Sequence, residues 1–439
     1  MSQRWRNSLA TLAAAVFTGV SALAQNGTFS DYSPYSVYGI GQLHDKGTAF
    51  NESMGGVGIA TRTRRYVNIL NPASITARDS LSFMADFGLN GKASYYTQGD
   101  AHSANNIMNI NNFIISFPIY RRSAMIIGIT PYSNVGYNFT YVESDPMKVG
   151  KMGNQGYSVY GAGSIYQMFA GGAVTLWDRL SLGAEYILYF GTIDRDLSLT
   201  FVDETYRDIS TGHTEQLRSS TGKFGLQYEQ PLGGGKTLTL GATYKLSTPI
   251  GGYSTDATYA SMESIVDTIS FSSVHLTGTE TLKFASEIGV GVSLRAGERW
   301  LAEVDYTRSD WTGSGFDNVS GFRNNSAFNF SSSVAQTLRA GFAYTPNRND
   351  IRYFYRRITY RGGLYCGETY YKLDGNPVTS YGLTLGATVP VSKGYNGVTL
   401  GLDIGKRGTA KNGMVRENYI GFSFGVNIFD IWFQKSQYR

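Results

Sequence analysis

The side chains that most often carry catalysis or bind metals are scattered through this sequence. Its four histidines, His44, His102, His213 and His275, are isolated and lack the i, i+4 or clustered partners of a metal site. The one cysteine, Cys366, excludes an internal disulfide framework. The sequence therefore predicts that the protein is not an enzyme and that it holds no metal and no cofactor.

One glycine-rich run resembles a phosphate-binding loop. Glycines 233–235 precede Lys236 and Thr237, but the full spacing of that motif is missing and no helical pattern follows. The run separates two segments of alternating apolar residues, where a hairpin turn belongs. We interpret it as a turn.

Charged residues recur on one parity of segments whose other parity is apolar. They are Asp86, Glu185, Glu287, Glu303, Asp305, Arg339 and Asp403. A Lys or Arg that faces lipid costs about 2–4 kcal/mol near the bilayer midplane, so this placement predicts that the charged parity lines an aqueous lumen. Arg339 is expected beside Glu303 and Asp305, within reach of cross-strand pairing. The charges either stabilise the wall and tether an enclosed segment or select polar substrates, and we favour the first interpretation.

The segments that carry these charges alternate with period 2 from residue 81 onward. The run at 180–190 is typical, with Leu182 and Tyr186 on one face and Glu185 on the other. Successive side chains of a strand point to opposite faces, so each strand has an apolar wall and a small or polar wall. We therefore expect Leu182 and Tyr186 to face lipid.

Short turns alternate with longer polar stretches along this series, as in bacterial outer-membrane barrels. The turns divide the chain into fourteen expected strands, which include single strands at 236–260 and 264–295. The second of these spans is long enough to hold two strands, which would break the even count. A soluble sandwich or propeller is the alternative, but it does not require the alternation of loop lengths. The expected fold is all-β, a transmembrane antiparallel β-barrel.

Composition agrees with an exported barrel. The chain has 53 glycines, 32 tyrosines and 24 phenylalanines, and only 16% of its residues are charged, against about 25% in an ordinary soluble domain. Two arginines before an apolar run and Ala22-Leu23-Ala24 predict a cleaved signal peptide at 1–24. Without it the charge is 36 − 33 = +3, which gives no case for nucleic acid. We expect a monomeric barrel in the bacterial outer membrane, surrounded by its lipid.

Residues 25–80 differ from everything after them and are interpreted as a plug, or hatch, inside the barrel. Gly55, Gly56 and Gly58 allow tight turns and close packing. Asn71-Pro72-Ala73 indicates a fixed turn, because Pro72 has no backbone donor and biases Asn71 away from helix. Three arginines lie between these motifs, at 62, 64 and 65. They belong either to a solvated surface loop or, as we slightly favour, to ion pairs inside the barrel.

The run Ser53–Ala60 with the Asn71-Pro72-Ala73 turn resembles the hatch of the FadL/TodX family of outer-membrane transport proteins. The runs Gly405–Thr409 and Arg416–Tyr419 are similar to the version found in Bacteroidota. The resemblance implies passive uptake of hydrophobic, fatty-acid-like molecules, with the hatch as gate and a lateral exit through the wall. In the family that exit lies at a kink in the third strand. The matching strand here carries Pro131 and Gly136, and a proline inside a strand often marks a bulge.

Two features depart from this resemblance. The arginines make the hatch more basic than an apolar conduit suggests, and the chain ends in Tyr438-Arg439 where barrel assembly signals commonly end in an aromatic residue. Some Bacteroidota relatives are subunits of outer-membrane secretion or assembly machines. The alternative function is therefore an accessory barrel in a complex with other outer-membrane proteins.

Overall fold

The computed structural model describes residues 31–44, 47–79, 82–203, 205–262, 265–276, 282–318, 329–391 and 396–431. The predicted signal peptide at 1–24 lies outside these residues. No helix in the described part of the chain is long and apolar enough to cross a membrane.

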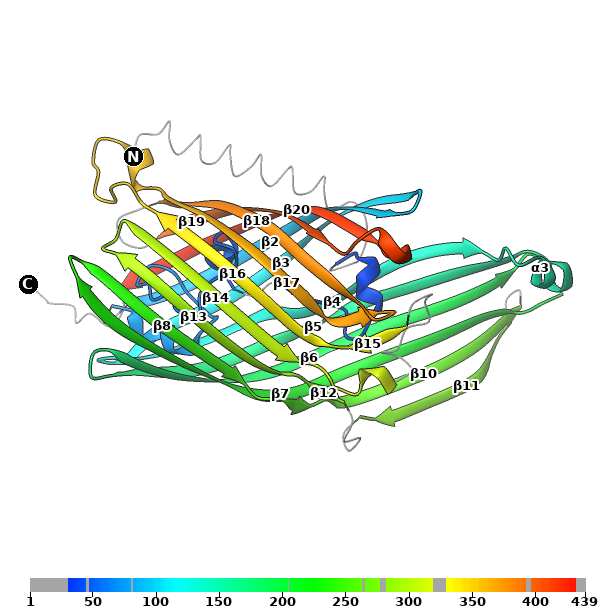
Figure 1. The fold of residues 1–439 in the computed structure, drawn as a ribbon. Helices are drawn as coiled ribbons and strands as arrows, with labels where there is room; N and C mark the ends of the chain where they lie inside the picture. The colour runs from blue at the N-terminus through cyan, green and yellow to red at the C-terminus, as the bar shows by residue number, and fades with distance from the viewer. Residues whose placement is uncertain are drawn as a thin grey trace, which may run out of the picture.

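Within the described residues, fourteen antiparallel strands form a closed barrel (Figure 1). Each strand pairs with its neighbours in the chain order of the barrel strands, and the last strand pairs with the first, from Ser82↔Ile431 to Thr97↔Arg416. The predicted fold class is therefore confirmed. The barrel strands are β2 (Ser82–Gln98), β3 (Ala101–Tyr120), β4 (Ser123–Val142), β5 (Gln155–Leu176), β6 (Leu180–Phe201), β7 (Asp208–Gly233), β8 (Lys236–Lys245), β13 (Ser286–Ala296), β14 (Trp300–Asp310), β16 (Val334–Tyr344), β17 (Thr359–Leu373), β18 (Asn376–Pro390), β19 (Gly397–Arg407) and β20 (Arg416–Ile431).

The side chains of the wall alternate between lipid and lumen as the period of the sequence requires. On β6, Leu182 and Tyr186 are exposed on the outer surface, whereas Ser181 and Glu185, each directly before one of them, are buried. The same alternation recurs on β14, where Val304 is exposed between the buried Glu303 and Asp305. The barrel therefore presents an apolar belt outside and polar groups inside.

Two of the fourteen predicted spans are wrong as single strands. The span 236–260 contains β8 and most of β10 (Gly251–Met262), and the span 264–295 contains β11 (Ile265–His275) and all but the last residue of β13. Strand β10 pairs with β11 and with the first half of β7, so β10 and β11 form a hairpin that extends the wall beyond β8 (Figure 1). Period-2 alternation identifies a strand but does not show where a strand leaves the barrel. The count of fourteen holds because this outer hairpin adds no strand to the ring.

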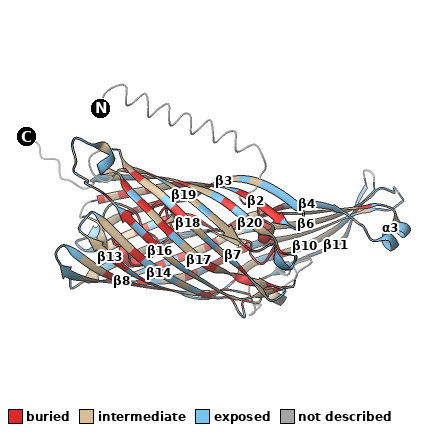
Figure 2. Ribbon diagram, turned by 45° about the horizontal axis from the view of Figure 1, so that its top comes forward, coloured by how far each residue is buried: buried red, intermediate tan, exposed pale blue. Residues whose placement is uncertain are grey.

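The two ends of the barrel differ. Tight turns at residues 121–122, 177–179 and 234–235 join strands at one end, which we assign to the periplasm because short turns face that side in bacterial barrels. The other end carries the outer hairpin and α3 (Pro146–Met152), which Figure 2 shows as an exposed tip far beyond the wall. Three smaller elements there are η3 (Phe316–Asn318), β15 (Phe330–Ser332) and η5 (Lys411–Gly413).

Residues 31–44 and 47–79, called here the inner segment, lie inside the barrel (Figure 1). Their short elements are η1 (Pro34–Val37), β1 (Gln42–Leu43), α2 (Ala49–Glu52) and η2 (Pro72–Ala77). Such short pieces hold their shape only through contacts with their surroundings. The contacts between this segment and the wall therefore define the candidate site.

The register of the wall gives a direct test. Val304 is 50% exposed in the apolar belt, so Val304→Lys should lower the free energy of unfolding by about 2–4 kcal/mol. Phe271 is 66% exposed on the outer hairpin, and Phe271→Lys should change it by less than about 0.5 kcal/mol. Urea unfolding in lipid bilayers measures both. Equal losses for the two variants would contradict the position of the belt.

Candidate functional site

The glycine-rich run of the inner segment binds two carboxylates on β14. The amides of Gly58 and Ile59 donate to Oδ2 of Asp305, at 2.7 and 2.9 Å. The amide of Ala60 donates to Oε1 of Glu303 at 2.7 Å. Three consecutive N–H groups thus bind two carboxyl groups that are almost completely buried, while the second oxygen of Asp305 has no hydrogen-bond partner among the described residues.

Gly55 and Gly56 form the turn that directs these amides at the wall. Both have φ of +74°, a conformation that side chains strain. The amide of Gly55 donates to the hydroxyl of Thr384 at 2.7 Å. Arg339 lies opposite Asp305 in the ladder, as predicted, but its guanidinium packs against Gly56 and donates to Thr307 at 3.0 Å.

The Asn71-Pro72-Ala73 turn joins the inner segment to itself and to the wall. Asn71 accepts from the amide of Ala73 at 3.0 Å, which caps η2, and Pro72 occupies the first position of that helix. The Nδ2 of Asn71 donates to the carbonyls of Ile59 and of Leu226 on β7, at 2.8 and 3.1 Å. One side chain therefore connects the turn, the glycine-rich run and the barrel.

Glycines of the wall make room for this packing. At eight positions on eight strands, an added Cβ would lie less than 3.0 Å from an atom of the inner segment. We call these residues the glycine ring: Gly183, Gly225, Gly241, Gly289, Gly341, Gly363, Gly386 and Gly425. The sequence analysis did not predict the ring. A signal for it exists in the sequence, since Gly183 lies on the same parity as the lumen-facing Glu185.

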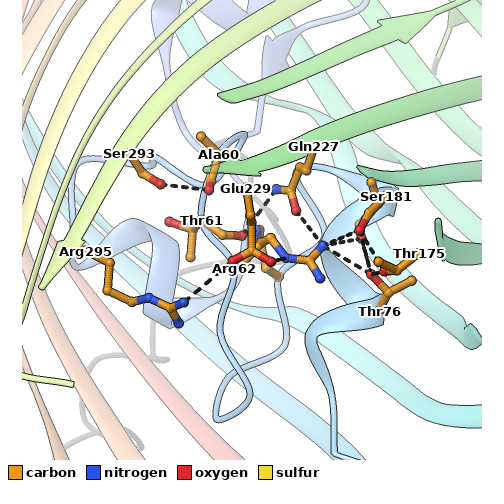
Figure 3. A network of polar contacts seen from close by, with 12 residues as sticks. Ala60, Thr61, Arg62, Thr76, Thr175, Ser181, Gln227, Glu229, Ser293 and Arg295 are labelled. Atoms are coloured by element: carbon orange, nitrogen blue, oxygen red, sulfur yellow. Dashed lines mark hydrogen bonds and ion pairs between the residues drawn. The ribbon is translucent and has the colours of Figure 1, made fainter. Parts of the chain in front are cut away.

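The three arginines of the inner segment divide between the two interpretations. Arg62 is buried, forms an ion pair with Glu229 at 2.8 Å and donates to Ser181 at 2.7 Å, at the centre of the network in Figure 3. Arg64 is exposed and pairs with Asp79 at 3.1 Å. Arg65 reaches Glu298 in a turn of the wall at 3.1 Å. Of the three, Arg62 alone therefore follows the interpretation of a buried ion pair inside the barrel.

The remaining predicted lumen charges bond to the wall. Asp86 accepts from Asn112 at 2.7 Å, and Asp403 accepts from the hydroxyl of Tyr365 at 2.9 Å. Glu185 lies 3.9 Å from Lys223. The predicted set is thus not one network, since Glu303 and Asp305 hold the inner segment and the others pair along the wall.

A cavity of about 200 Å³ lies between the inner segment and the wall. Its lining includes an apolar group and a charged group. The apolar residues include Leu43, Ile69, Phe169, Ile187 and Trp311, and the charged ones include Glu185, Lys223, Lys245, Glu287, Arg339, Glu368 and Arg407. Lys245 and Glu287 approach to 4.0 Å, so part of this charge is already paired.

Toward the outer end, the start of the inner segment fills an aromatic cluster. The ring of Tyr38 lies 6.1 Å from that of Phe330 and 5.6 Å from that of Tyr371. The hydroxyl of Tyr370 donates to the carbonyl of Tyr38 at 3.1 Å, and that of Tyr371 donates to the carbonyl of Tyr35 at 3.2 Å. The arm at residues 31–44 is therefore held at both main chain and side chain.

The wall is interrupted between β3 and β4. Their ladder extends from the periplasmic turn to the pair Phe113↔Ile129, and among the described strands the rest of β3 pairs with β2 alone. The register of β4 against β5 shifts after Pro131, where the missing N–H of proline suits a bulge. The two strands diverge from this point.

The arm of the inner segment pairs with the diverging part of β4. In this short ladder Gln42 lies opposite Asn134, and Leu43 lies opposite Ser133. The carbonyl of Gly136 accepts from the amide of Ser33 at 2.9 Å. Backbone groups on the edge of β4 that do not pair with β3 thus form hydrogen bonds with the arm, from inside the barrel.

No group of three or more His, Cys, Asp or Glu side chains within the described residues is arranged to hold a metal ion. The arrangement built from these residues is mechanical. It consists of an enclosed segment, its anchors, a cavity beside it and a break in the wall.

The carboxylate anchors give a second prediction. Asp305→Ala removes the acceptor of two buried amides, and each unsatisfied group costs about 1–3 kcal/mol. Hydrogen exchange at Gly58 and Ile59 should accelerate, while the barrel still folds. Asp403→Ala is the matched control, because Asp403 bonds to Tyr365 in the wall. Equal acceleration in both variants, or none in either, would contradict the anchoring role.

The comparisons place the fold and the family. The toluene transporter TodX of Pseudomonas putida superposes with a TM-score of 0.58 at 14% identity, covering 88% of this chain and 99% of that one. A Pseudomonas aeruginosa FadL homologue gives 0.58 at 11% identity, covering 89% and 100%. The monoaromatic hydrocarbon channel CymD gives 0.56 at 13% identity, covering 90% and 98%. A search of curated protein sequences found no match.

At these identities the likeness establishes a FadL/TodX-type fold. A family model gives the closer assignment, since the model described as BamG matches residues 7–439, nearly the whole sequence. The chain belongs to the BamG family.

Proposed function

We propose that this protein is an outer-membrane channel for passive uptake of hydrophobic small molecules, and that the described state is closed. The observation that carries the proposal is the break between β3 and β4, which leaves the wall without a continuous ladder beyond Phe113 and Ile129. In a bilayer an open edge is tolerated only where protein satisfies it. The arm of the inner segment meets that need along β4, so movement of the arm would open the wall.

The proposed route begins at the aromatic cluster. A hydrophobic ligand gains by exchanging water for apolar and aromatic surface, and Tyr35 and Tyr38 of the arm occupy that surface in the closed state. Displacement of the arm would free the cluster and expose the edge of β4 at Pro131 and Gly136. The ligand would then leave sideways into the membrane.

The hatch residues have a separate role in this proposal. Gly58, with Ile59 and Ala60, anchors the lower part of the inner segment to β14, and Asn71 anchors it to β7. Gly55, Gly56, Pro72 and Ala73 shape the two turns that carry those anchors. These contacts would stay in place and close the periplasmic end while the arm moves.

Several finer statements remain predictions. They are cleavage of the signal peptide at 1–24, the monomeric state, fatty-acid-like ligands, and membership of the Bacteroidota version of the FadL/TodX family.

A disulfide can lock the proposed gate. Residues opposite each other in an antiparallel pair have Cα atoms about 4.5–5.5 Å apart, which suits a disulfide. Leu43→Cys with Ser133→Cys, in a Cys366→Ser background, would join β1 to β4. Oxidation should reduce uptake of radiolabelled oleate at least tenfold in host cells that lack their own long-chain fatty-acid channel, and reduction should restore it.

The matched control is a disulfide that leaves the arm free. Tyr95→Cys with Ala104→Cys joins β2 to β3, which are already a hairpin, and should leave uptake unchanged. Uptake that persists in the oxidised Leu43–Ser133 variant would overturn the gate. No uptake by the unmodified protein would overturn the channel itself.

A second candidate function is an accessory subunit of an outer-membrane complex. The outer hairpin favours it, because β11 pairs only with β10 among the described strands and carries exposed Ile265, Ile269 and Phe271. A long exposed edge with apolar side chains is a template for another chain. The charged lining of the lumen cavity also suits a barrel that conducts no hydrophobic ligand.

Gentle extraction followed by mass spectrometry separates the two functions. A subunit should co-purify with a stoichiometric protein, and replacing Ile269 and Phe271 by Ser should release that protein. A channel should carry a bound hydrophobe and no stoichiometric protein. Co-purification that is unaffected by the hairpin substitutions would contradict the role assigned to β11.

A further inference from the structure

A second cavity opens at the periplasmic end, between the inner segment and the turns of the wall. Its volume is about 370 Å³, within the range of about 300–1,000 Å³ usual for small-molecule sites. The residues 62–66 of the inner segment line one side. Phe50, the β7–β8 turn, the β13–β14 turn, the end of β16 with the segment after it, and the start of β17 line the rest. This cavity is separate from the charged one deeper in the lumen.

The lining of this periplasmic pocket is dominated by arginine. Three of its arginines come from the inner segment, two flank the β13–β14 turn, one follows β16 and one lies on β17. They are Arg62, Arg64, Arg65, Arg295, Arg299, Arg348 and Arg361. Among the described residues, Glu298 is the one carboxylate in the lining. No lysine takes part, although Lys and Arg supply the same charge.

Ion pairs neutralise only part of this charge. Glu298 lies 3.1 Å from Arg65 and 3.8 Å from Arg348. Outside the lining, Glu229 pairs with Arg62 and Arg295, at 2.8 and 3.6 Å, and Asp79 pairs with Arg64 at 3.1 Å. Seven arginines against these three carboxylates leave an excess of four positive charges within the set. A concave site lined by one sign of charge attracts a counter-ion strongly.

Arg361 adds an independent sign of a ligand. It is 4% exposed, and its guanidinium packs against the stacked rings of Phe50 and Tyr66, 4.7 Å from each centroid. One nitrogen, Nη1, donates to Thr388 at 2.6 Å. The Nε and Nη2 groups reach no acceptor within hydrogen-bond geometry among the described residues, although the hydroxyl of Tyr66 interacts with this guanidinium. Buried guanidinium donors without an acceptor are costly, and a bound anion at this pocket would satisfy them.

The chemistry of the lining selects the kind of anion. A guanidinium presents a planar fork of donors that matches the oxygens of a phosphate, whereas an ammonium acts as a point charge. We propose that this pocket binds a multiply charged oxyanion of the phosphate type, either a free phosphorylated solute of the periplasm or the phosphate of a lipid headgroup. Because the pocket is lined by both the inner segment and the wall, the anion would bridge the two. The proposal does not depend on whether the barrel conducts hydrophobic molecules.

Inorganic pyrophosphate is the first probe, titrated calorimetrically into the detergent-solubilised protein at constant ionic strength. Arg299→Gln should weaken binding about tenfold or more, since one charged hydrogen-bond donor is lost. Arg352→Gln removes the same charge from an exposed site in the loop after β16, outside the pocket, and should change binding less than twofold. Glu298→Gln should tighten binding several-fold, because it removes the competing carboxylate. A purely structural role for Glu298 gives no such gain.

Native mass spectrometry identifies the source of the anion. Protein extracted from membranes that contain phosphatidylglycerol should retain a phospholipid, lost in the Arg299→Gln/Arg348→Gln variant, if the lipid headgroup is the ligand. Pyrophosphate binding that is unaffected by added phosphatidylglycerol identifies a free solute instead. The proposal is overturned if neither probe depends on the pocket arginines, or if Arg352→Gln weakens binding as much as Arg299→Gln. Heat-modifiable migration on gels confirms that each variant is folded.

Discussion

The structure depends on hydrogen bonds between the main chain of the inner segment and the carboxylates of β14. An irregular segment enclosed by a barrel carries amides that cannot pair within it, and a buried carboxylate needs donors. Asp305 and Glu303 meet both needs through the amides of residues 58–60. These bonds therefore hold the glycine-rich run of the inner segment against one strand.

The other contacts follow from that anchor. With the glycine-rich run held against β14, the Asn71 turn meets β6 and β7, and the arm runs toward the outer end along β4. The wall accepts this arrangement because it presents main chain at the glycine ring, where a side chain would collide. The inner segment therefore fits the barrel through both hydrogen bonds to the wall and the space that the wall glycines leave.

The sequence was sufficient to predict the wall because the bilayer constrains the orientation of the side chains on each strand. Lipid outside and water inside impose period 2, so the outward orientation of Leu182 and the inward orientation of Glu185 could be derived locally. The limits of the strands at 236–260 and 264–295 could not be derived in this way, because the same period-2 alternation continues outside the membrane. The pairing of Asp305 with Gly58 joins residues 247 positions apart. Such contacts are set by the closed fold, and no pattern in a single sequence specifies them.

The glycine ring also bears on how the protein is assembled. Glycine is a weak strand former because it gains nothing from packing a side chain and loses much conformational freedom, so the wall is intrinsically least stable where it faces the inner segment. Gly363 and Gly55 are far apart in sequence, and contacts of that kind form late in folding. The inner segment therefore packs against main chain that the wall leaves without side chains, and each completes the packing of the other. A barrel deprived of the segment would leave these glycines without packing partners, in addition to losing whatever the segment closes.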